Sequence, residues 1–382
     1  MKIVVDSAIP FVDDAFGTFG SLVKLESRAI DDLAVRDADA IIVRSETKVD
    51  AKLLAGSKVQ FVGTATIGTD HVDTVFLENQ GITFASAPGS NSNAVVQYVF
   101  AALFTLAERR HFLLKGKTLG VVGVGNIGSK VVRIGQKLGM NVLQNDPPLE
   151  RATRDPEFVP LDELMKSDFI TIHVPFTRMG PDPTFHLFDE NRLALMKKGS
   201  VLINSSRGGV VDNKALKGVL TSKLLGEVVL DVWENEPKID VDLLSACAIG
   251  TPHIAGYSID GKVNATKMVL RAFCERFGLR ESGDLSLLVS APEQPVIEID
   301  GGSSDDERVI AAVIRHCYDI REDDKSLRKI TSVDPAARGN FFKRLRSGYH
   351  FRHEFSNYSV EVKEEESSLG EILSSFGFRW ST

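Results

Sequence analysis

The chain contains few cysteines, and their spacing excludes several classes of protein. Its 382 residues include three cysteines, Cys247, Cys274 and Cys317, which lie far apart and form no CxxC pair. Such an odd and sparse set argues against a disulfide framework or a zinc site and fits a reducing compartment. We therefore predict a cytoplasmic protein without a structural metal.

The sequence also lacks an excess of positive charge and a long hydrophobic run. Its formal net charge of −7 disfavours wholesale binding to nucleic acid or to an anionic membrane. The start, MKIVVDSAIP, has no basic region before an apolar core, so we expect a first strand there and no signal peptide. The most apolar stretch, residues 94–107, is too short to span a bilayer and predicts a buried helix.

What the chain does contain is an alternation of short β-branched runs with helical segments. The strands predicted in the first ninety or so residues are 2–6, 40–44, 59–63 and 82–86. After the apolar helix the same alternation restarts, with strands predicted in TLGVVGVG, NVLQND, FITIHVP, SVLINSS and EVVLDV. This pattern predicts βαβ units, and hence an α/β protein with two Rossmann-like, doubly wound parallel sheets.

Composition changes near Glu281, where the chain becomes polar and rich in turn formers. The last hundred residues contain helical and strand patterns without a further βαβ alternation, which predicts a smaller α+β domain. Since the second sheet uses its last strand before His253, we expect the helix after it to return to the first domain. The predicted domains are 1–93 with 255–280, then 94–254, then 281–382.

A glycine motif marks the beginning of the second alternation. Gly123, Gly125 and Gly128 form G-x-G-x-x-G between a predicted strand and a predicted helix. In this context the glycines permit a tight turn, a close approach of a pyrophosphate, and close helix packing. Asp146 lies 18 residues after Gly128, at the end of the next predicted strand. A carboxylate there can bind ribose hydroxyls and repel a 2′-phosphate, which favours NAD over NADP. Alternatively, Asp146 is a turn former before Pro147.

Three residues of catalytic type follow the glycine motif, each after a short apolar run. They are Arg207, Glu236 and His253. The carboxyl ends of parallel strands face the ligand crevice, so we expect the three side chains to meet beside the dinucleotide. His253 would act as general acid and base, Glu236 would hold its ring, and Arg207 would bind a substrate carboxylate. Taken singly, each could be a strand end, a loop residue or a structural histidine.

Asp231 ends another predicted strand and is a candidate for binding the nicotinamide carboxamide, with a cap or turn as the alternative.

At this point the chain resembles the D-isomer-specific 2-hydroxyacid dehydrogenases over roughly residues 1–280. The motifs that carry the resemblance are GVGNIG, INSSRGGVVD, DVWENEP and TPHIAGYS, in that order. The resemblance implies an Arg–Glu–His catalytic set, NAD as cofactor, a split substrate domain and a homodimer. It also implies further cofactor contacts, mainly through the backbone, at Asn126, Ile127, Val174, Ser206, Arg207, Gly208 and Gly256.

For the substrate, the resemblance suggests Ser45, Thr66 and Tyr257. Ser45 follows a predicted strand end, Thr66 lies in a loop whose N–H groups could hold a carboxylate, and Tyr257 is four residues past His253. Each could instead be a turn or packing residue. The start of the chain, the IAGYSIDGK form of the histidine motif and the extra C-terminal domain narrow the expectation. With these features the chain resembles one branch of the family, and that resemblance implies oxidation of a small phosphorylated hydroxy acid on the route to vitamin B6, with residues 281–382 serving dimerisation.

Two questions stay open at the level of sequence. The chain could act on another D-2-hydroxy acid, such as phosphoglycerate or glyoxylate/hydroxypyruvate, or it could be a non-catalytic NAD-sensing co-regulator. The basic run near Arg344 and Arg346 is typical of a solvated face. A sharper hypothesis is that one of these arginines reaches the partner subunit's cleft and binds the substrate phosphate.

Overall fold

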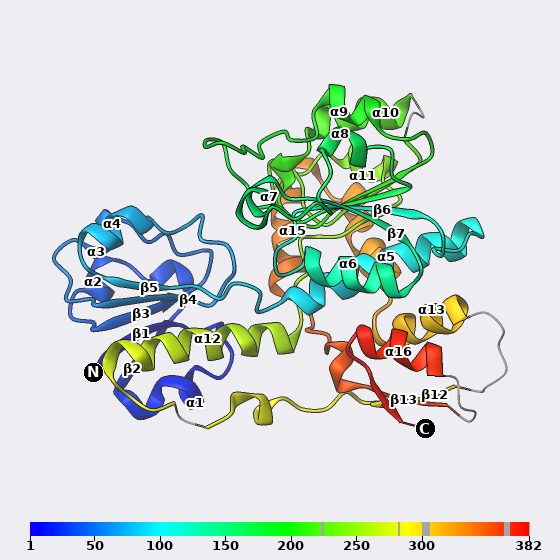
Figure 1. Ribbon diagram of the computed structural model, residues 1–382. Helices are drawn as coiled ribbons and strands as arrows, with labels where there is room; N and C mark the ends of the chain where they lie inside the picture. Colours follow the sequence, from blue (N-terminus) through cyan, green and yellow to red (C-terminus); the bar gives the residue numbers. More distant parts are fainter. Residues whose placement is uncertain (223–224, 282, 300–305, 363–366, 382) are drawn as a thin grey trace. The chain divides into compact units, whose positions relative to one another are not determined.

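The computed structural model describes residues 1–222, 225–281, 283–299, 306–362 and 367–381. The chain divides into two compact units, Met1–Ser92 with Ser258–Ala291 and Asn93–Tyr257 with Pro292–Thr382. A parallel sheet forms the centre of each unit (Figure 1). No helix in the described part of the chain is long and apolar enough to cross a membrane.

The first unit contains a five-stranded parallel sheet with the strand order β2-β1-β3-β4-β5. The strands are β1 (Lys2–Asp6), β2 (Ser21–Leu25), β3 (Ala40–Val43), β4 (Phe61–Thr64) and β5 (Thr83–Ala85). Helices α1 (Val12–Phe16) and α12 (Ile259–Phe277) cover one face, and α2 (Asp32–Val35), α3 (Ala51–Leu54) and α4 (Thr74–Asn79) cover the other (Figure 1). Short 3₁₀ turns η1 (Gly17–Phe19), η2 (Ser27–Ala29) and η4 (Leu285–Leu288) complete the unit. Central strands such as β3 are buried along their whole length because both faces are covered.

Helix α12 comes from a distant part of the sequence and belongs to this first unit. It begins at a Ser258 cap, whose hydroxyl accepts the Gly261 N–H, and ends at Gly278 in the left-handed region. The Phe273 ring packs edge-on against Phe16 and Phe61, with ring centroids 5.5 and 5.6 Å away. Aromatic packing of this kind fixes α12 on the sheet.

The second unit contains a six-stranded parallel sheet with the order β11-β10-β9-β8-β6-β7. Its strands are β6 (Thr118–Val122), β7 (Asn141–Asn145), β8 (Phe169–Ile172), β9 (Val201–Asn204), β10 (Glu227–Leu230) and β11 (Ile249–Gly250). Its helices up to Tyr257 are α5 (Ser92–Arg110), α6 (Gly128–Lys137), α7 (Pro147–Thr153), α8 (Leu161–Leu164), α9 (Glu190–Leu195), α10 (Asn213–Thr221), α11 (Val241–Ala246) and the turn η3 (Gly208–Val210). The chain order reverses between β6 and β8, which makes this the topological switch point where such sheets bind ligands.

The C-terminal residues pack onto the second unit. They form a three-stranded sheet, β12-β13-β14, whose strands are all parallel. The elements are β12 (Val296–Ile299), α13 (Asp306–Cys317), α14 (Ile320–Arg328), η5 (Lys329–Ser332), η6 (Pro335–Ala337), α15 (Arg338–Ser347), η7 (Phe355–Asn357), β13 (Ser359–Val362), α16 (Ser367–Ser375) and β14 (Arg379–Ser381). The Phe376 ring packs against Phe100 of α5 with centroids 5.1 Å apart, so the C-terminal sheet and the second unit share one core.

The structure contains elements that the sequence patterns did not predict. Strand β2 is an edge strand and is only half buried, so SLVKL lacks the continuous β-branched run of its neighbours. Helix α14 is highly polar along IREDDKSLR, and β14 has three residues. Short, polar or edge elements carry too weak a hydrophobic period to be recognised.

Candidate active site

The glycine motif forms the turn between β6 and α6. Gly123 has a φ of 88°, and a Cβ there would lie 2.8 Å from the His173 backbone. A Cβ on Gly128 would lie 1.9 Å from the Gly123 carbonyl oxygen. Both glycines are therefore required by the packing of the chain itself. Gly125 differs, because it is exposed and a Cβ there would meet nothing within 4 Å among the described residues. This open space at the start of α6 fits the approach of a dinucleotide pyrophosphate.

Asp146 connects the glycine turn to the next helix. Its Oδ2 accepts the Val124 N–H at 2.8 Å, and its Oδ1 accepts the Leu149 N–H at 3.0 Å as the cap of α7. The carboxylate therefore does more than form a turn. Since a carboxylate can accept about four hydrogen bonds, capacity for ribose hydroxyls is left, and that contact stays a prediction.

Glu236 and His253 are in direct contact after the adjacent strands β10 and β11. The Nδ1 of His253 lies 2.7 Å from Oε2 of Glu236, and Oε1 of Glu236 accepts the Trp233 N–H at 2.8 Å. Burial alone would raise the pKa of Glu236, but the neighbouring His253, the Trp233 N–H and the charge of Arg346 together lower it. An ionised carboxylate can only accept, so Nδ1 carries the proton and Nε2 is left to exchange one.

The His253 loop is anchored by Asp231, which follows β10 and is 1% exposed. The carboxylate of Asp231 accepts the N–H groups of Ile254 and Ala255 and the hydroxyl of Thr251, at 2.7, 3.0 and 2.7 Å. His253 itself has a φ of 60°, in the left-handed region. Such strained conformations persist where surrounding bonds over-determine them. Asp231 thus has a structural task, and its contact with the nicotinamide stays a prediction.

Arg207 lies just past β9, the neighbour of β10, with an extended backbone. Its loop contacts the Glu236 loop, because a Cβ on Gly208 would lie 2.0 Å from the Trp233 carbonyl oxygen. Only a glycine at 208 allows the two loops to approach this closely. The arginine therefore lies on a loop packed directly against the loop that carries Glu236.

The remaining predicted cofactor residues also belong to the second unit. Val174 follows β8, Ser206 follows β9, and Gly256 lies in the His253 loop. Ser206 is held through its hydroxyl and its N–H by the Asn204 side-chain oxygen, at 2.8 and 3.0 Å. In the glycine turn, Asn126 is exposed and Ile127 half buried.

The predicted substrate residues Ser45 and Thr66 belong to the first unit. Ser45 is exposed in the turn after β3, next to Arg44, whose Nε lies 3.2 Å from a carboxylate oxygen of Asp6. The Thr66 hydroxyl donates to the Gly68 carbonyl oxygen at 3.0 Å, which shapes the loop after β4. Their contact with substrate stays a prediction.

Sequence reasoning missed a second set of contacts that holds the Glu236 loop. Glu234 accepts the Asn213 N–H at 3.0 Å, and its other oxygen lies 2.8 Å from Nε2 of His186. Asp212 is 3.7 Å from Nδ1 of the same ring. The position of Glu234, two residues before Glu236, was only a weak indication that it supports this loop. No spacing in the sequence connects His186 with Glu234.

The C-terminal segment holds the other end of the His253 loop. Arg352, which is 6% exposed, donates to the carbonyl oxygens of Ala255, Ala94, Tyr257 and Ile254 at 2.7, 3.0, 3.2 and 3.5 Å. A planar guanidinium suits such a multiple contact because its donors point in fixed directions. The loop carrying the imidazole is therefore fixed by Asp231 on one side and by Arg352 on the other.

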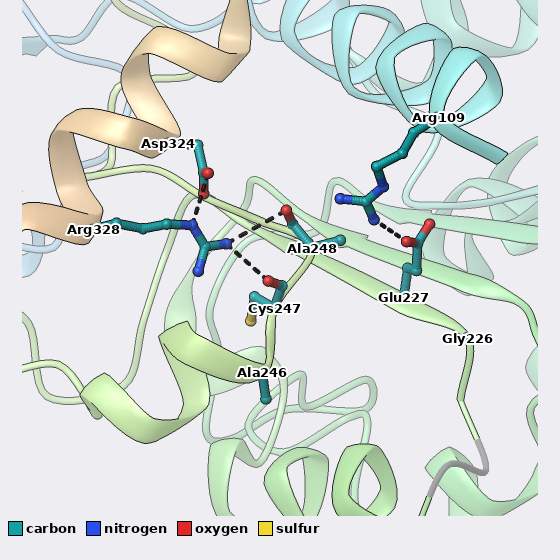
Figure 2. A pocket seen from close by; sticks show the side chains of 8 residues that line it. All are labelled: Arg109, Gly226, Glu227, Ala246, Cys247, Ala248, Asp324 and Arg328. Atoms are coloured by element: carbon teal, nitrogen blue, oxygen red, sulfur yellow. Dashed lines mark hydrogen bonds and ion pairs between the residues drawn. The ribbon is translucent and has the colours of Figure 1, made fainter. Parts of the chain in front are cut away.

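A well-defined hollow of the structure lies away from these residues. Figure 2 shows this cavity of about 470 Å³ at the amino end of β10 and just before β11, the opposite end of the strands from Asp231. It is lined by Arg109, Gly226, Glu227, Ala246, Cys247, Ala248, Asp324 and Arg328. Arg109 pairs with Glu227, and Arg328 with Asp324 and two carbonyl oxygens (Figure 2). The charged side chains that line this cavity are thus paired within the chain.

Comparison with known proteins defines the class. A family model described as "D-isomer specific 2-hydroxyacid dehydrogenase, NAD binding domain" matches residues 92–255, and a domain of unknown function matches 290–377. A crystal structure of D-lactate dehydrogenase from Aquifex aeolicus with NAD and lactic acid is 27% identical with a TM-score of 0.60. It covers 72% of this chain and 96% of its own. Residues 92–255, nearly all of them in the second unit, thus match the NAD-binding domain of the D-isomer-specific 2-hydroxyacid dehydrogenases.

Relatives that match along the whole length define the branch. Erythronate-4-phosphate dehydrogenase of Pseudomonas fluorescens is 41% identical over 99% of this chain and 100% of its own. The enzyme of the same name from Escherichia coli O157:H7 is 42% identical over 99% and 98%. The chain belongs to the erythronate-4-phosphate dehydrogenase family.

Proposed function

We propose that the protein oxidises 4-phospho-D-erythronate to (R)-3-hydroxy-2-oxo-4-phosphooxybutanoate with NAD, as the names of its relatives imply. The product would serve the synthesis of pyridoxine 5′-phosphate in the cytoplasm. We further propose that the enzyme works as a homodimer joined through residues 281–382. The observation that carries the proposed reaction is the 2.7 Å contact between Glu236 and His253, at the same carboxyl edge of the sheet as the glycine turn.

The proposed mechanism assigns each residue one task. Arg207 binds the substrate carboxylate with its planar donors and polarises the C2 oxygen. The Nε2 of His253 takes the proton of the C2 hydroxyl while the C2 hydride leaves. Glu236 fixes the ring and stabilises the imidazolium that forms. NAD, when bound, would supply the hydride acceptor, and the glycine turn around Gly125 would hold its pyrophosphate.

The test is the His253→Gln variant, assayed by NADH absorbance and by NAD binding. Loss of the general base should lower kcat by at least about 1,000-fold while NAD binding is retained. Undiminished turnover would show that another group takes the proton. The control is Lys325→Gln on α14. We expect its turnover to be unchanged because the Lys325 side chain is exposed.

A substrate panel tests the choice of hydroxy acid. We expect 4-phospho-D-erythronate to be preferred over 3-phosphoglycerate, glyoxylate, hydroxypyruvate and lactate. Binding of NAD without turnover of any of these acids would favour the non-catalytic co-regulator.

A further inference from the structure

Helix α15 brings one arginine of the C-terminal basic run to the His253 loop of the same chain. The Nη2 of Arg346 lies 3.5 Å from the hydroxyl of Tyr257, four residues past His253. Arg344, two residues earlier, is exposed and lies over the Phe341 ring of its own helix. The two arginines therefore differ in surroundings, and Arg346 is the one directed to the active-site loop.

Apart from the Tyr257 hydroxyl, the surroundings of Arg346 match its charge and donors only partly. The residue is half buried, and its Nε is fully buried without a hydrogen-bond partner among the described residues. Within the same residues, no carboxylate lies within 4 Å of its guanidinium. Its charge nevertheless acts on Glu236, whose pKa it helps to lower. A half-buried guanidinium with no carboxylate beside it favours an anion next to its terminal N–H groups.

Tyr257 is held in place to complete such a site. The guanidinium of Arg352 binds its carbonyl oxygen at 3.2 Å. Its ring packs against Tyr349 and Phe351, with centroids 5.9 and 6.2 Å away. The position of the Tyr257 hydroxyl beside Arg346 is therefore fixed by contacts from the C-terminal segment.

The proposed substrate has an anionic group at each end. Arg207 is assigned to the carboxylate, so the phosphate requires a second cation within reach of His253. Two carbons and an ester oxygen separate this phosphate from the oxidised C2. We propose that Arg346 and the Tyr257 hydroxyl form the subsite that binds the phosphate monoester, within the chain that carries His253. This inference rests on the proposed function and replaces the hypothesis of an arginine reaching across to a partner subunit.

The test compares Arg346→Gln with its matched control Arg344→Gln on the same helix. Each is assayed with 4-phospho-D-erythronate and with unphosphorylated D-erythronate. Loss of a charge-assisted pair should lower kcat/KM for the phosphorylated acid at least about 30-fold, mainly through KM. We expect less than about a 3-fold change for D-erythronate, and no change in either for Arg344→Gln. Arg346→Lys should recover part of the loss because it restores the charge without the planar fork.

Two further measurements keep the inference testable if Arg346→Gln folds poorly. Tyr257→Phe removes one oxygen and should lower only the phosphorylated reaction, about 3- to 10-fold. Broadening of the ³¹P signal of inorganic phosphate should occur with the wild type and be lost in Arg346→Lys and Arg346→Gln in proportion to the kinetic loss.

Equal losses with both substrates would overturn the inference and assign Arg346 to support of Glu236. An unchanged preference in Arg346→Gln would also overturn it, and Arg44→Gln would then identify a site in the first unit. If the wild type bound inorganic phosphate through Arg346 but oxidised neither acid, the proposed reaction would fail while the subsite stood.

Discussion

At the scale of single residues, burial shifts the pKa of a charged side chain in the first unit. Lys262, in the first turn of α12, is the clearest case in the first unit. Burial lowers the pKa of Lys262 to about 8, and the positive charge of Arg44 adds to the effect.

The pKa of Lys262 gives a prediction with a definite sign. Below pH 8 the amine is charged in both the folded and the unfolded chain, so the full cost of burying the charge lowers the free energy of unfolding. Between pH 8 and 10.5 only the unfolded chain keeps the proton, so stability rises with pH. Lys262→Met should therefore stabilise the protein at pH 7 by about 1–2 kcal/mol, allowing for solvent screening, and by nothing near pH 11.

The measurement is an NMR titration of ¹³Cε-labelled lysine together with urea unfolding at both pH values. Lys325, exposed on α14, provides the reference signal. A Lys262 midpoint at pH 10 or above would mean that the amine is solvated or matched by an anion.

At the scale of elements, strand ends and loops were predictable to different degrees. The contact of Glu236 with His253 followed from the rule that carboxyl ends of parallel strands share one edge, and both predicted runs became strands. The anchoring of the His253 loop by Arg352 was not predictable. Ninety-nine residues separate Arg352 from His253, and the partners of the guanidinium are backbone carbonyls, which leave no mark in the sequence. Asp231 was selected correctly as a strand-end residue, but its bonds to the loop N–H groups depend on the left-handed turn at His253.

Arg352→Met should loosen the His253 loop. The substitution keeps much of the length but leaves four carbonyl oxygens without their donor, so we expect a loss of about 3 kcal/mol or more in the free energy of unfolding. Turnover should fall together with the free energy of unfolding. Arg352→Lys should be intermediate between the wild type and Arg352→Met in both quantities.

Urea unfolding and kcat at saturating substrate are the measurements for this prediction. Arg344→Met, on exposed α15, should change stability by less than about 0.5 kcal/mol. A stable Arg352→Met enzyme with full turnover would mean that Asp231 holds the loop alone.

At the scale of the whole molecule, the last ninety residues are part of the second unit. The sequence predicted a separate small domain from 281 onward, whereas the structure groups Pro292–Thr382 with the NAD-binding residues. The reason is physical, because Phe376 and Phe378 contribute to the same apolar core as Phe100 and Phe104 of α5. A change in composition marks where a segment begins, but cannot tell whether its apolar face is self-contained.

Deletion of residues 292–382 should therefore do more than remove a proposed dimer contact. It exposes the apolar face of α5, so we expect an insoluble or molten second unit that fails to bind NAD. Phe376→Ala should destabilise the full chain by about 3–5 kcal/mol. Leu287→Ser, at an 83% exposed position, should leave stability unchanged.

Solubility, NAD binding and sedimentation of each variant are the readouts for this prediction. A soluble, NAD-binding monomer after the deletion would restore the view of an independent dimerisation domain.

The hydrogen bonds from Arg352 to the His253 loop also have a consequence for the synthesis of the chain on the ribosome. The residues predicted to contact NAD all precede residue 257, yet the loop that carries His253 is held by a side chain made nearly a hundred codons later. A ribosome that stops early thus releases a polypeptide in which the apolar face of α5 and the His253 loop both lack their C-terminal partners. Hydride transfer is in this way reserved for chains that have been made almost to their end.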